Sequence, residues 1–287
     1  MTSSVDSNSR LHRSLKTFKS IPKTVFITGG ASGFGRFLAE TLLQANVDVA
    51  IFDRQITAEL VQSLSTGKVS DKQVLATYEV DICCATTTTQ VIDRACREVA
   101  TPELVIHCAG ILKTAPFQEL SEDTFRQVID VNLIGSRNLA AAILPHLSAG
   151  SHLVLFASLA GIVATYSQAA YAASKFGVLG LAEVLRLELK QTGIDVSVVC
   201  PGEVQTPMLD EERRSGSSIT KELNAVAGVL SLEQAGQQIL RGIGRRQYMI
   251  TPGIRAKLIR EFARKASTLF RWLSDHKLQR ELFGKRS

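Results

Sequence analysis

Tyr171 and Lys175 are four residues apart in a segment that reads Tyr-Ala-Ala-Ser-Lys. If this segment is helical, a spacing of four places the phenol and the ammonium on one face. A phenol is a poor base at neutral pH because its pKa is about 10, but a neighbouring cation stabilises the phenolate and lowers that pKa. The pair therefore predicts general acid and base chemistry at a carbonyl or hydroxyl oxygen.

Two polar residues that precede this pair could complete such a site. Ser158 follows an apolar run over residues 152–157, and its hydroxyl could hold a substrate oxygen. Asn132 lies inside an expected helix over residues 121–147, where its amide could hold a water molecule that links Lys175 to solvent. Each has a structural alternative, because Ser158 could cap a loop and Asn132 could be a satisfied core amide.

A glycine-rich segment, TGGASGFG at residues 28–35, lies between a β-branched apolar run and a helical pattern. In that context its first glycine permits a sharp turn out of a strand, and its third lets backbone N–H groups approach a pyrophosphate. Its last glycine lets the helix pack close to the sheet, and the helix N-terminus then faces the anion. The segment predicts a dinucleotide site whose contacts are Gly29, Ser32, Gly33, Phe34 and Gly35.

Asp53 ends the second apolar run and bears on the choice between NAD and NADP. A carboxylate there can accept hydrogen bonds from both ribose hydroxyls of NAD and would repel the 2′-phosphate of NADP. Arg54 follows directly and could instead pair with that phosphate or lie over the adenine. We therefore predict NAD, with NADP as the alternative.

Two later positions extend the predicted nucleotide site. Asp81 ends the third apolar run, with Ile82 beside it, and could reach the adenine amino group or cap the next helix. Ala109 and Gly110 follow the fourth run and leave room for a cofactor ribose.

Apolar runs alternate with helical patterns along most of the chain. Strands are expected over residues 23–28, 47–53, 74–80, 104–108, 152–157, 195–200 and 247–250. Their apolar character throughout is typical of a parallel sheet with both faces covered. The alternation predicts a doubly wound (Rossmann) α/β fold, which places ligands at the carboxyl ends of its strands.

With these residues in place, the chain resembles the short-chain dehydrogenase/reductase family over about residues 22–250. The matching positions are residues 28–35, Asp81, CAG at 108–110, Asn132, Ser158, YAASK at 171–175, Pro201-Gly202 and Thr206. The resemblance implies a sheet of seven parallel strands with helices on both faces. It implies an oxidoreductase that moves a hydride between a nicotinamide cofactor and a ketone or secondary alcohol.

The resemblance also assigns roles to single residues. It implies a catalytic tetrad of Asn132, Ser158, Tyr171 and Lys175, with Tyr171 and Lys175 also contacting the cofactor. It further implies that Pro201, Gly202, Val204 and Thr206 hold the nicotinamide carboxamide. The chain departs from the family where Cys108 stands in place of the usual Asn, which is expected to affect the rigidity of the central strand and not the chemistry.

Four regions are expected along the chain. Residues 1–21 form a flexible N-terminus, residues 22–252 form the dehydrogenase domain, and residues 253–287 form a basic amphipathic helical tail. Within the domain, residues 203–230 show no firm periodicity and are expected to form a substrate lid. Small apolar residues follow Ser158, so the pocket is expected to suit an apolar or lipid-like carbonyl compound.

The tail is the most basic part of the chain, since residues 254–287 carry ten Lys and Arg residues against three acids. Apolar residues recur through it at helical spacing. They could pack on the body or on another subunit, lie on an anionic membrane surface, or cover the substrate entrance. The region from Thr206 through the tail also resembles the 3-ketodihydrosphingosine reductase branch, which implies an NADP-dependent reductase of long-chain 3-keto lipids as an alternative.

Charge and composition limit the other classes of function. Positive charge lies at both ends and not over the body, which disfavours nucleic-acid binding. The five cysteines include no CxxC pair or Cys/His cluster, so free thiols and no metal site are expected. A cytoplasmic homodimer or homotetramer is expected, with membrane association through the tail left open. A nucleotide-sensing regulator is the non-enzymatic alternative.

Overall fold

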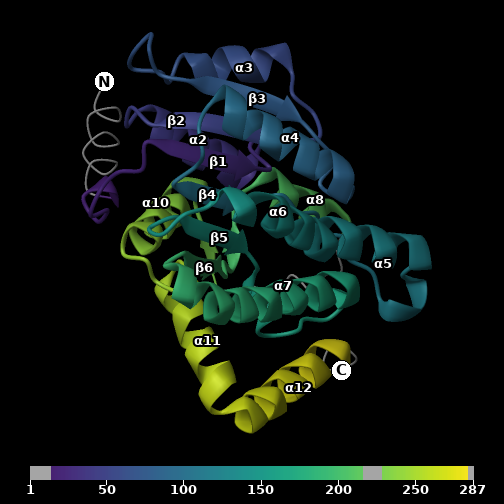
Figure 1. The fold of residues 1–287 in the computed structure, drawn as a ribbon. Coiled ribbons are helices and arrows are strands. Elements are labelled where there is room, and N and C mark those ends of the chain that lie inside the picture. Colours follow the sequence, from purple (N-terminus) through teal and green to yellow (C-terminus); the bar gives the residue numbers. More distant parts are fainter. Residues whose placement is uncertain (1–13, 216–227, 284–287) are drawn as a thin grey trace, which may run out of the picture.

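The protein, described here by a computed structural model, is built around one parallel sheet of seven strands (Figure 1). The structure describes residues 14–215 and 228–283. The strand order is β3-β2-β1-β4-β5-β6-β9. The strands are β1 (Thr24–Thr28), β2 (Asp48–Asp53), β3 (Leu75–Glu79), β4 (Leu104–His107), β5 (His152–Phe156), β6 (Asp195–Val199) and β9 (Met249–Ile250). The predicted doubly wound, seven-stranded sheet is confirmed.

The central strands are buried along their whole length. Every residue of β1, β4 and β5 is buried, because neighbouring strands flank both edges and helices cover both faces. This environment explains why these runs are apolar throughout and do not alternate with polar residues.

Helices cover both faces of the sheet, and each face has its own hydrophobic cluster. On one face Ile27 of β1 belongs to a cluster with Leu42 and Leu240. On the other face Phe26 belongs to a cluster with Ile92 and Val178. The helices of the first face are α2 (Gly33–Leu43), α3 (Ala58–Ser65) and α10 (Leu232–Gly244), and those of the second are α4 (Ala85–Glu98), α5 (Glu122–Ile129), α6 (Gly135–Ile143) and α7 (Ala169–Glu188).

The helix expected over residues 121–147 is interrupted. A wider π-helical turn, Asp130–Ile134, separates α5 from α6, and a short 3₁₀ turn ends the segment. Asn132 lies in this wider turn and is completely buried. Such turns often occur at functional sites because they redirect a side chain that a regular helix would place elsewhere.

The segment over residues 203–230 is more ordered at its ends than its composition predicted. A short strand, β7 (Glu203–Val204), pairs with β8 (Val229–Leu230). Between them α8 spans Pro207–Ser215, with a proline at its first position and basic residues in its last turn, both of which favour a helix. The middle of the predicted lid lies outside the described residues.

The tail forms two helices joined at a corner. α11 spans Ile254–Lys265 and α12 spans Ser267–Phe283. The backbone leaves the helical region at Ala266 (φ −130°, ψ 50°), and the rings of Phe262 and Phe270 meet across the corner with centroids 5.7 Å apart. Figure 1 shows α11 leaving the sheet edge and α12 turning back toward the side that carries α7.

The chain is packed against the dehydrogenase domain from residue 14 onward, which lies within the predicted flexible N-terminus. Leu15 is buried in the first cluster, and Arg241 of α10 donates to the hydroxyl of Ser14. Thr17 and Phe18 lie against Gly244, at a distance that a Cβ on this glycine would not permit. The prediction is therefore wrong from residue 14 onward, and residues 1–13 lie outside the described residues.

Candidate active site

A cavity of about 770 Å³ lies at the carboxyl ends of the central strands. Each residue predicted to bind the cofactor lines it: Gly29, Ser32, Gly33, Phe34, Gly35, Asp53, Arg54, Asp81, Ile82, Ala109, Gly110, Tyr171, Lys175, Pro201, Gly202, Val204 and Thr206. Ser158 lines it as well, whereas the buried Asn132 lies behind its wall. One cavity thus brings together positions from 29 to 206 of the chain.

The glycine loop forms a cradle that side chains would fill. Gly29 has φ +67°, and a Cβ on it would lie 2.6 Å from the backbone N of Ala109. A Cβ on Gly35 would meet the carbonyl oxygen of Gly29, so α2 packs against the loop only because this residue is glycine.

The start of α2 suits an anion. Ser32 caps the helix in an extended conformation without a side-chain hydrogen bond to it, and the first turn of this helix holds no acidic residue. Its free N–H groups and the positive end of the helix dipole favour a phosphate group. Thr206 lies on the other side, with its methyl group 3.9 Å from where a Cβ of Gly33 would be. This cradle fits the pyrophosphate of a dinucleotide.

The Asp53 carboxylate, at the end of β2, is fixed in place where it lines the cavity. One oxygen accepts from the N–H of Ala31 at 2.9 Å, and the other accepts from the N–H of Arg54 at 2.7 Å. Because backbone donors hold both oxygens, the remaining lone pairs have a fixed direction toward ribose hydroxyls. Asp81 is held similarly, by the N–H of Cys83 at 2.9 Å.

Ser158, Tyr171 and Lys175 lie together where β5 meets α7. The Lys175 ammonium is buried and donates to the carbonyl oxygen of Phe156 at 2.8 Å. Its nitrogen is 5.7 Å from the centroid of the Tyr171 ring. The Ser158 hydroxyl accepts from the N–H of Ala160 at 3.1 Å and lies close enough to Tyr171 to lower the pKa of its phenol.

Burial controls the ionisation of this group. Burial and, to a smaller extent, the negative charge of Glu212 raise the pKa of Tyr171 to about 12. The nearby Ser158 hydroxyl acts in the opposite direction and lowers this pKa. Burial also lowers the pKa of Lys175 to about 8. The expected lowering of the Tyr171 pKa is therefore wrong, because desolvation of the phenol outweighs the other effects. At neutral pH Tyr171 holds its proton and can donate it to a carbonyl oxygen.

Asn132 braces the site from behind. Its amide NH₂ donates to the carbonyl oxygen of Ile111 and to the hydroxyl of Ser174, both at 2.9 Å, and its oxygen accepts from the N–H of Ile111 at 2.8 Å. Ser174 in turn donates to the carbonyl oxygen of Tyr171 at 2.7 Å. Both amide hydrogens are thus donated to protein atoms, as in the alternative of a satisfied core amide, and these bonds position the first turn of α7.

Where the family usually has Asn, this chain has Cys108, and hydrogen bonds between β1 and β4 hold the strand at this point. The N–H of Cys108 still donates to the carbonyl oxygen of Thr28 at 3.0 Å. The Thr28 hydroxyl and Nδ1 of His107 are 2.6 Å apart, which adds a side-chain bond between β1 and β4. Burial lowers the pKa of His107 to about 3, so the imidazole is neutral. His107 is not among the residues predicted above, although a histidine in a buried apolar run indicates such a bond.

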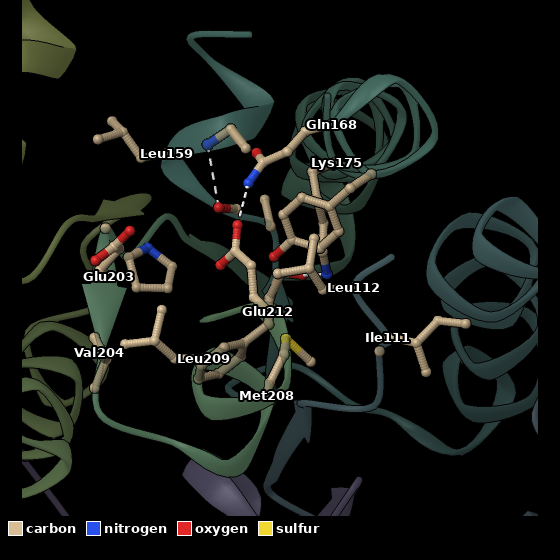
Figure 2. A pocket seen from close by; sticks show the side chains of 18 of the residues that line it. Ile111, Leu112, Leu159, Gln168, Lys175, Glu203, Val204, Met208, Leu209 and Glu212 are labelled. Atoms are coloured by element: carbon tan, nitrogen blue, oxygen red, sulfur yellow. Dashed lines mark hydrogen bonds between the residues drawn. The ribbon is translucent and has the colours of Figure 1, made fainter. Parts of the chain in front are cut away.

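Two polar residues of the cavity were also missed. Gln168, just before α7, donates from Nε2 to Oε1 of Glu212 on α8 at 2.7 Å, and both side chains are buried (Figure 2). A helical interpretation of residues 207–215 would have placed Leu209 and Glu212 on one face. Because residues 203–230 show no firm periodicity, the sequence did not indicate this helix or the shared face of Leu209 and Glu212.

The two pKa shifts predict a pH profile for carbonyl reduction. When Tyr171 donates its proton, the resulting phenolate needs the Lys175 charge, and that charge is lost as the pH rises through about 8 and not 10.5. We expect kcat/KM for reduction to be nearly constant from about pH 6 to 7 and to fall by about tenfold per pH unit well above pH 8. In a Lys175→Arg variant, any activity that remains should lack this fall because guanidinium stays protonated. A wild-type rate that is constant to pH 10 would contradict the assignment.

Comparison with known proteins agrees with this geometry. A family model described as short chain dehydrogenase matches residues 23–216. The 3-dehydrosphinganine reductase of Danio rerio is 27% identical over 222 residues, which is 76% of this chain and 67% of that protein. A 3-dehydrosphinganine reductase of Arabidopsis thaliana is 29% identical over 232 residues, which is 79% of this chain and 69% of that protein.

Solved structures show the same fold. A short-chain dehydrogenase/reductase from Burkholderia phymatum in complex with NAD has a TM-score of 0.74 and 22% identity, covering 86% of this chain and 94% of that one. The 3-oxoacyl-[acyl-carrier protein] reductase of Brucella melitensis in complex with NAD has a TM-score of 0.71 and 19% identity, covering 82% and 98%. With two thirds of its length matched by the family model, the chain belongs to the short-chain dehydrogenase family of nicotinamide-dependent oxidoreductases.

Proposed function

We propose that this protein reduces the keto group of a long-chain, lipid-like substrate, with NADH as the preferred cofactor. The observation that carries this proposal is the continuation of the cavity from Tyr171 into the tail. Its far wall is built from apolar side chains of α11 and α12, namely Ile259, Phe262, Phe270, Leu273 and Leu278. A hydrocarbon chain would leave water along this wall, at about 25 cal/mol per Å² of apolar surface buried.

The relatives point the same way. The proteins from Danio rerio and Arabidopsis thaliana are named for the reduction of 3-dehydrosphinganine, and one from Mus musculus is a 3-ketodihydrosphingosine reductase. Of the three interpretations of the tail, its lining of the cavity favours a cover over the substrate entrance.

The residues of the chain divide the reaction between them. A nicotinamide cofactor held by the glycine loop and Asp53 would supply the hydride for the carbonyl carbon. The Ser158 hydroxyl holds the carbonyl oxygen, and Tyr171 donates the proton that this oxygen takes up. Lys175 stabilises the phenolate left on Tyr171, and the product is a secondary alcohol. Because Tyr171 is protonated at neutral pH, the site is prepared for reduction.

Replacement of Tyr171 by Phe tests the catalytic assignment. We expect kcat to fall by about 10²- to 10⁴-fold, because the proton donor is lost, while the Kd for NADH measured by fluorescence stays within a few fold. Tyr78→Phe is the matched control, since its hydroxyl bonds Glu98 at the distant β3 edge. Full turnover by Tyr171→Phe on a confirmed substrate would show that another group donates the proton.

The cofactor preference is tested at Asp53. We expect wild-type protein to bind NADH more tightly than NADPH, because the fixed carboxylate accepts from ribose and repels a 2′-phosphate. Asp53→Ser should weaken NADH binding by about 10- to 100-fold, which corresponds to the loss of hydrogen bonds to a charged group. The same variant should bind NADPH more tightly. Asp81→Asn is the control, because a contact to adenine affects both cofactors alike. Equal binding of both cofactors by wild-type protein would refute the proposed preference.

We also propose that the tail rests on an anionic membrane surface. Large apolar side chains on α11 and α12 that do not line the cavity are exposed, namely Ile254, Leu258, Leu269 and Trp272. Basic residues lie among them, including Arg255, Lys257, Lys265 and Arg271. None of the helices in the described parts of the chain is long and apolar enough to cross a bilayer. Substrate could then pass from the lipid into the adjoining cavity.

Vesicle binding tests this surface. A Leu258→Ser, Trp272→Ser double variant should bind phosphatidylserine-containing vesicles at least about tenfold more weakly, since each side chain contributes about 1.5–3 kcal/mol when it leaves water. Val69→Ser, at an exposed position in the loop before β3, is the control. Binding of the wild-type protein to these vesicles should weaken when salt is added. It should also be weaker on vesicles made of phosphatidylcholine alone. Equal binding by all three proteins would contradict the membrane contact.

The expected homodimer or homotetramer stays a prediction. Phe176, Val184 and Leu187 on α7 are exposed, which agrees with packing of this helix against a copy of itself. The alternative of a nucleotide-sensing regulator is disfavoured because Tyr171 and Lys175 are both present and both line the cavity.

A further inference from the structure

The last helix, α12, covers the cavity without being packed into the body of the fold. Phe270, Ser274 and Leu278 line the cavity from this helix. Yet no residue from 267 to 280 is buried, whereas α7 and α10 each bury a whole face. Burial of an apolar face is what holds a helix on a domain. The position of α12 is therefore held weakly.

The preceding helix, α11, is attached more firmly. Ala256 is buried near its start, and Arg260 donates to the hydroxyl of Thr251 at 3.0 Å. Just before the helix, the N–H of Gly253 donates to Oε1 of Gln238 on α10, also at 3.0 Å. These contacts fix α11 to the edge of the sheet, so α12 is the part of the tail that can move against the body.

The two helices meet at a single residue. The N–H of Ala266 donates to the carbonyl oxygen of Phe262 in α11, and its own carbonyl oxygen accepts from the N–H of Phe270 in α12, both at 2.9 Å. The chain changes direction at Ala266, whose φ and ψ angles lie outside the helical region. Hinges are typically a few residues of this kind at the ends of helices. Rotation at Ala266 would lift α12 and leave both helices intact.

α12 carries apolar side chains on two opposite faces. Phe270 and Leu278 face the cavity. Leu269 and Trp272 do not line it and are 50% and 61% exposed, and the helical repeat places Trp272 opposite Phe270. In water the body of the protein covers only one of these faces. On a lipid surface, with the helix lifted, both faces would leave water.

We propose that α12 is a hinged lid, which turns about Ala266 and opens the cavity when it contacts a lipid surface. This inference rests on the proposed membrane contact and reductase function, and it adds the movement that links them. In water the lid stays closed because the body partly covers Phe270 and Leu278. At the membrane the lipid covers both faces, so the open form binds the surface more tightly and is selected.

Trp272 is the single tryptophan of the chain and reports the position of the lid. Its emission overlaps the absorption of reduced nicotinamide, so excitation energy passes from Trp272 to NADH when the two lie at the same cavity. We expect this transfer in wild-type protein with NADH, and at least about a twofold decrease on phosphatidylserine-containing vesicles. Direct excitation of NADH checks that the cofactor stays bound. A blue shift of the Trp272 emission with unchanged transfer would overturn the lid, because α12 would then bind lipid in its closed position.

Lipids with brominated chains test the cavity face directly, because they quench only those tryptophans that reach the acyl chains. Wild-type protein carries its tryptophan on the outer face of α12, and a Trp272→Phe, Leu278→Trp variant carries it on the cavity face. We expect both to be quenched, the variant at least about half as strongly as the wild type. Quenching of the wild type alone would contradict the proposal, since the cavity face would then stay covered.

A third protein controls for contact that does not involve the tail. Trp272→Phe, Val69→Trp carries its tryptophan in the loop before β3, at the opposite edge of the sheet from β9 (Figure 1), and should not be quenched. Quenching equal to that of the wild type would refute binding through the tail. Unchanged NADH binding by the Leu278→Trp variant would show that it is folded. If it does not fold, the energy transfer from Trp272 in the wild type still decides.

Activity keeps the lid apart from the other proposals. A short-chain ketone that stays in water should show a kcat/KM at least about threefold higher when vesicles are added, because the open fraction rises. If no ketone is reduced but transfer falls and the cavity face is quenched, the reductase proposal fails and the lid stands. If the protein binds vesicles but neither transfer nor kcat/KM changes, the lid is refuted and the membrane contact stands. Without any binding to vesicles, the membrane contact and the lid both fail.

Discussion

The hydrogen bond from Lys175 to the carbonyl oxygen of Phe156 joins α7 to the end of β5. The ammonium is almost inaccessible to water, so it depends on acceptors that the protein supplies. Phe156 lies two residues before Ser158, and Lys175 lies one helical turn after Tyr171. One bond therefore aligns the serine on the strand with the tyrosine on the helix. The loop after Ser158 follows α7 closely, since a Cβ on Gly161 would lie 2.6 Å from the carbonyl oxygen of Lys175.

Desolvation at this junction also determines which reaction the site favours. A neutral phenol and an ammonium of lowered pKa are what a water-poor pocket permits. The negative charge of Glu212 acts in the same direction on Tyr171. The tyrosine is therefore a proton donor at neutral pH, which is the role that carbonyl reduction requires. Asn132 contributes by fixing the backbone of that turn.

The cavity combines segments that are distant in the chain and serve different parts of the ligand. The glycine loop and Asp53 form a polar end with fixed backbone donors and a fixed carboxylate. The two tail helices form an apolar end, while α8 adds a single charge between them. Exposed apolar and basic side chains also lie on the same tail helices, and we propose that they contact a lipid surface. In our proposal the body of the fold carries the chemistry, and the tail helices contribute to the choice of substrate.

The sequence by itself determined what depends on local rules. Buried parallel strands require apolar runs, a tight strand-to-helix turn requires glycine, and a spacing of four places Tyr171 and Lys175 on one face. Hence the sheet, the nucleotide end and the reacting pair could be predicted. Only the tertiary structure decided the burial that reverses the expected shift of the Tyr171 pKa, the partners of Asn132, and the inward direction of Glu212. Desolvation and packing depend on residues far apart in the chain, so spacing along one segment does not contain them.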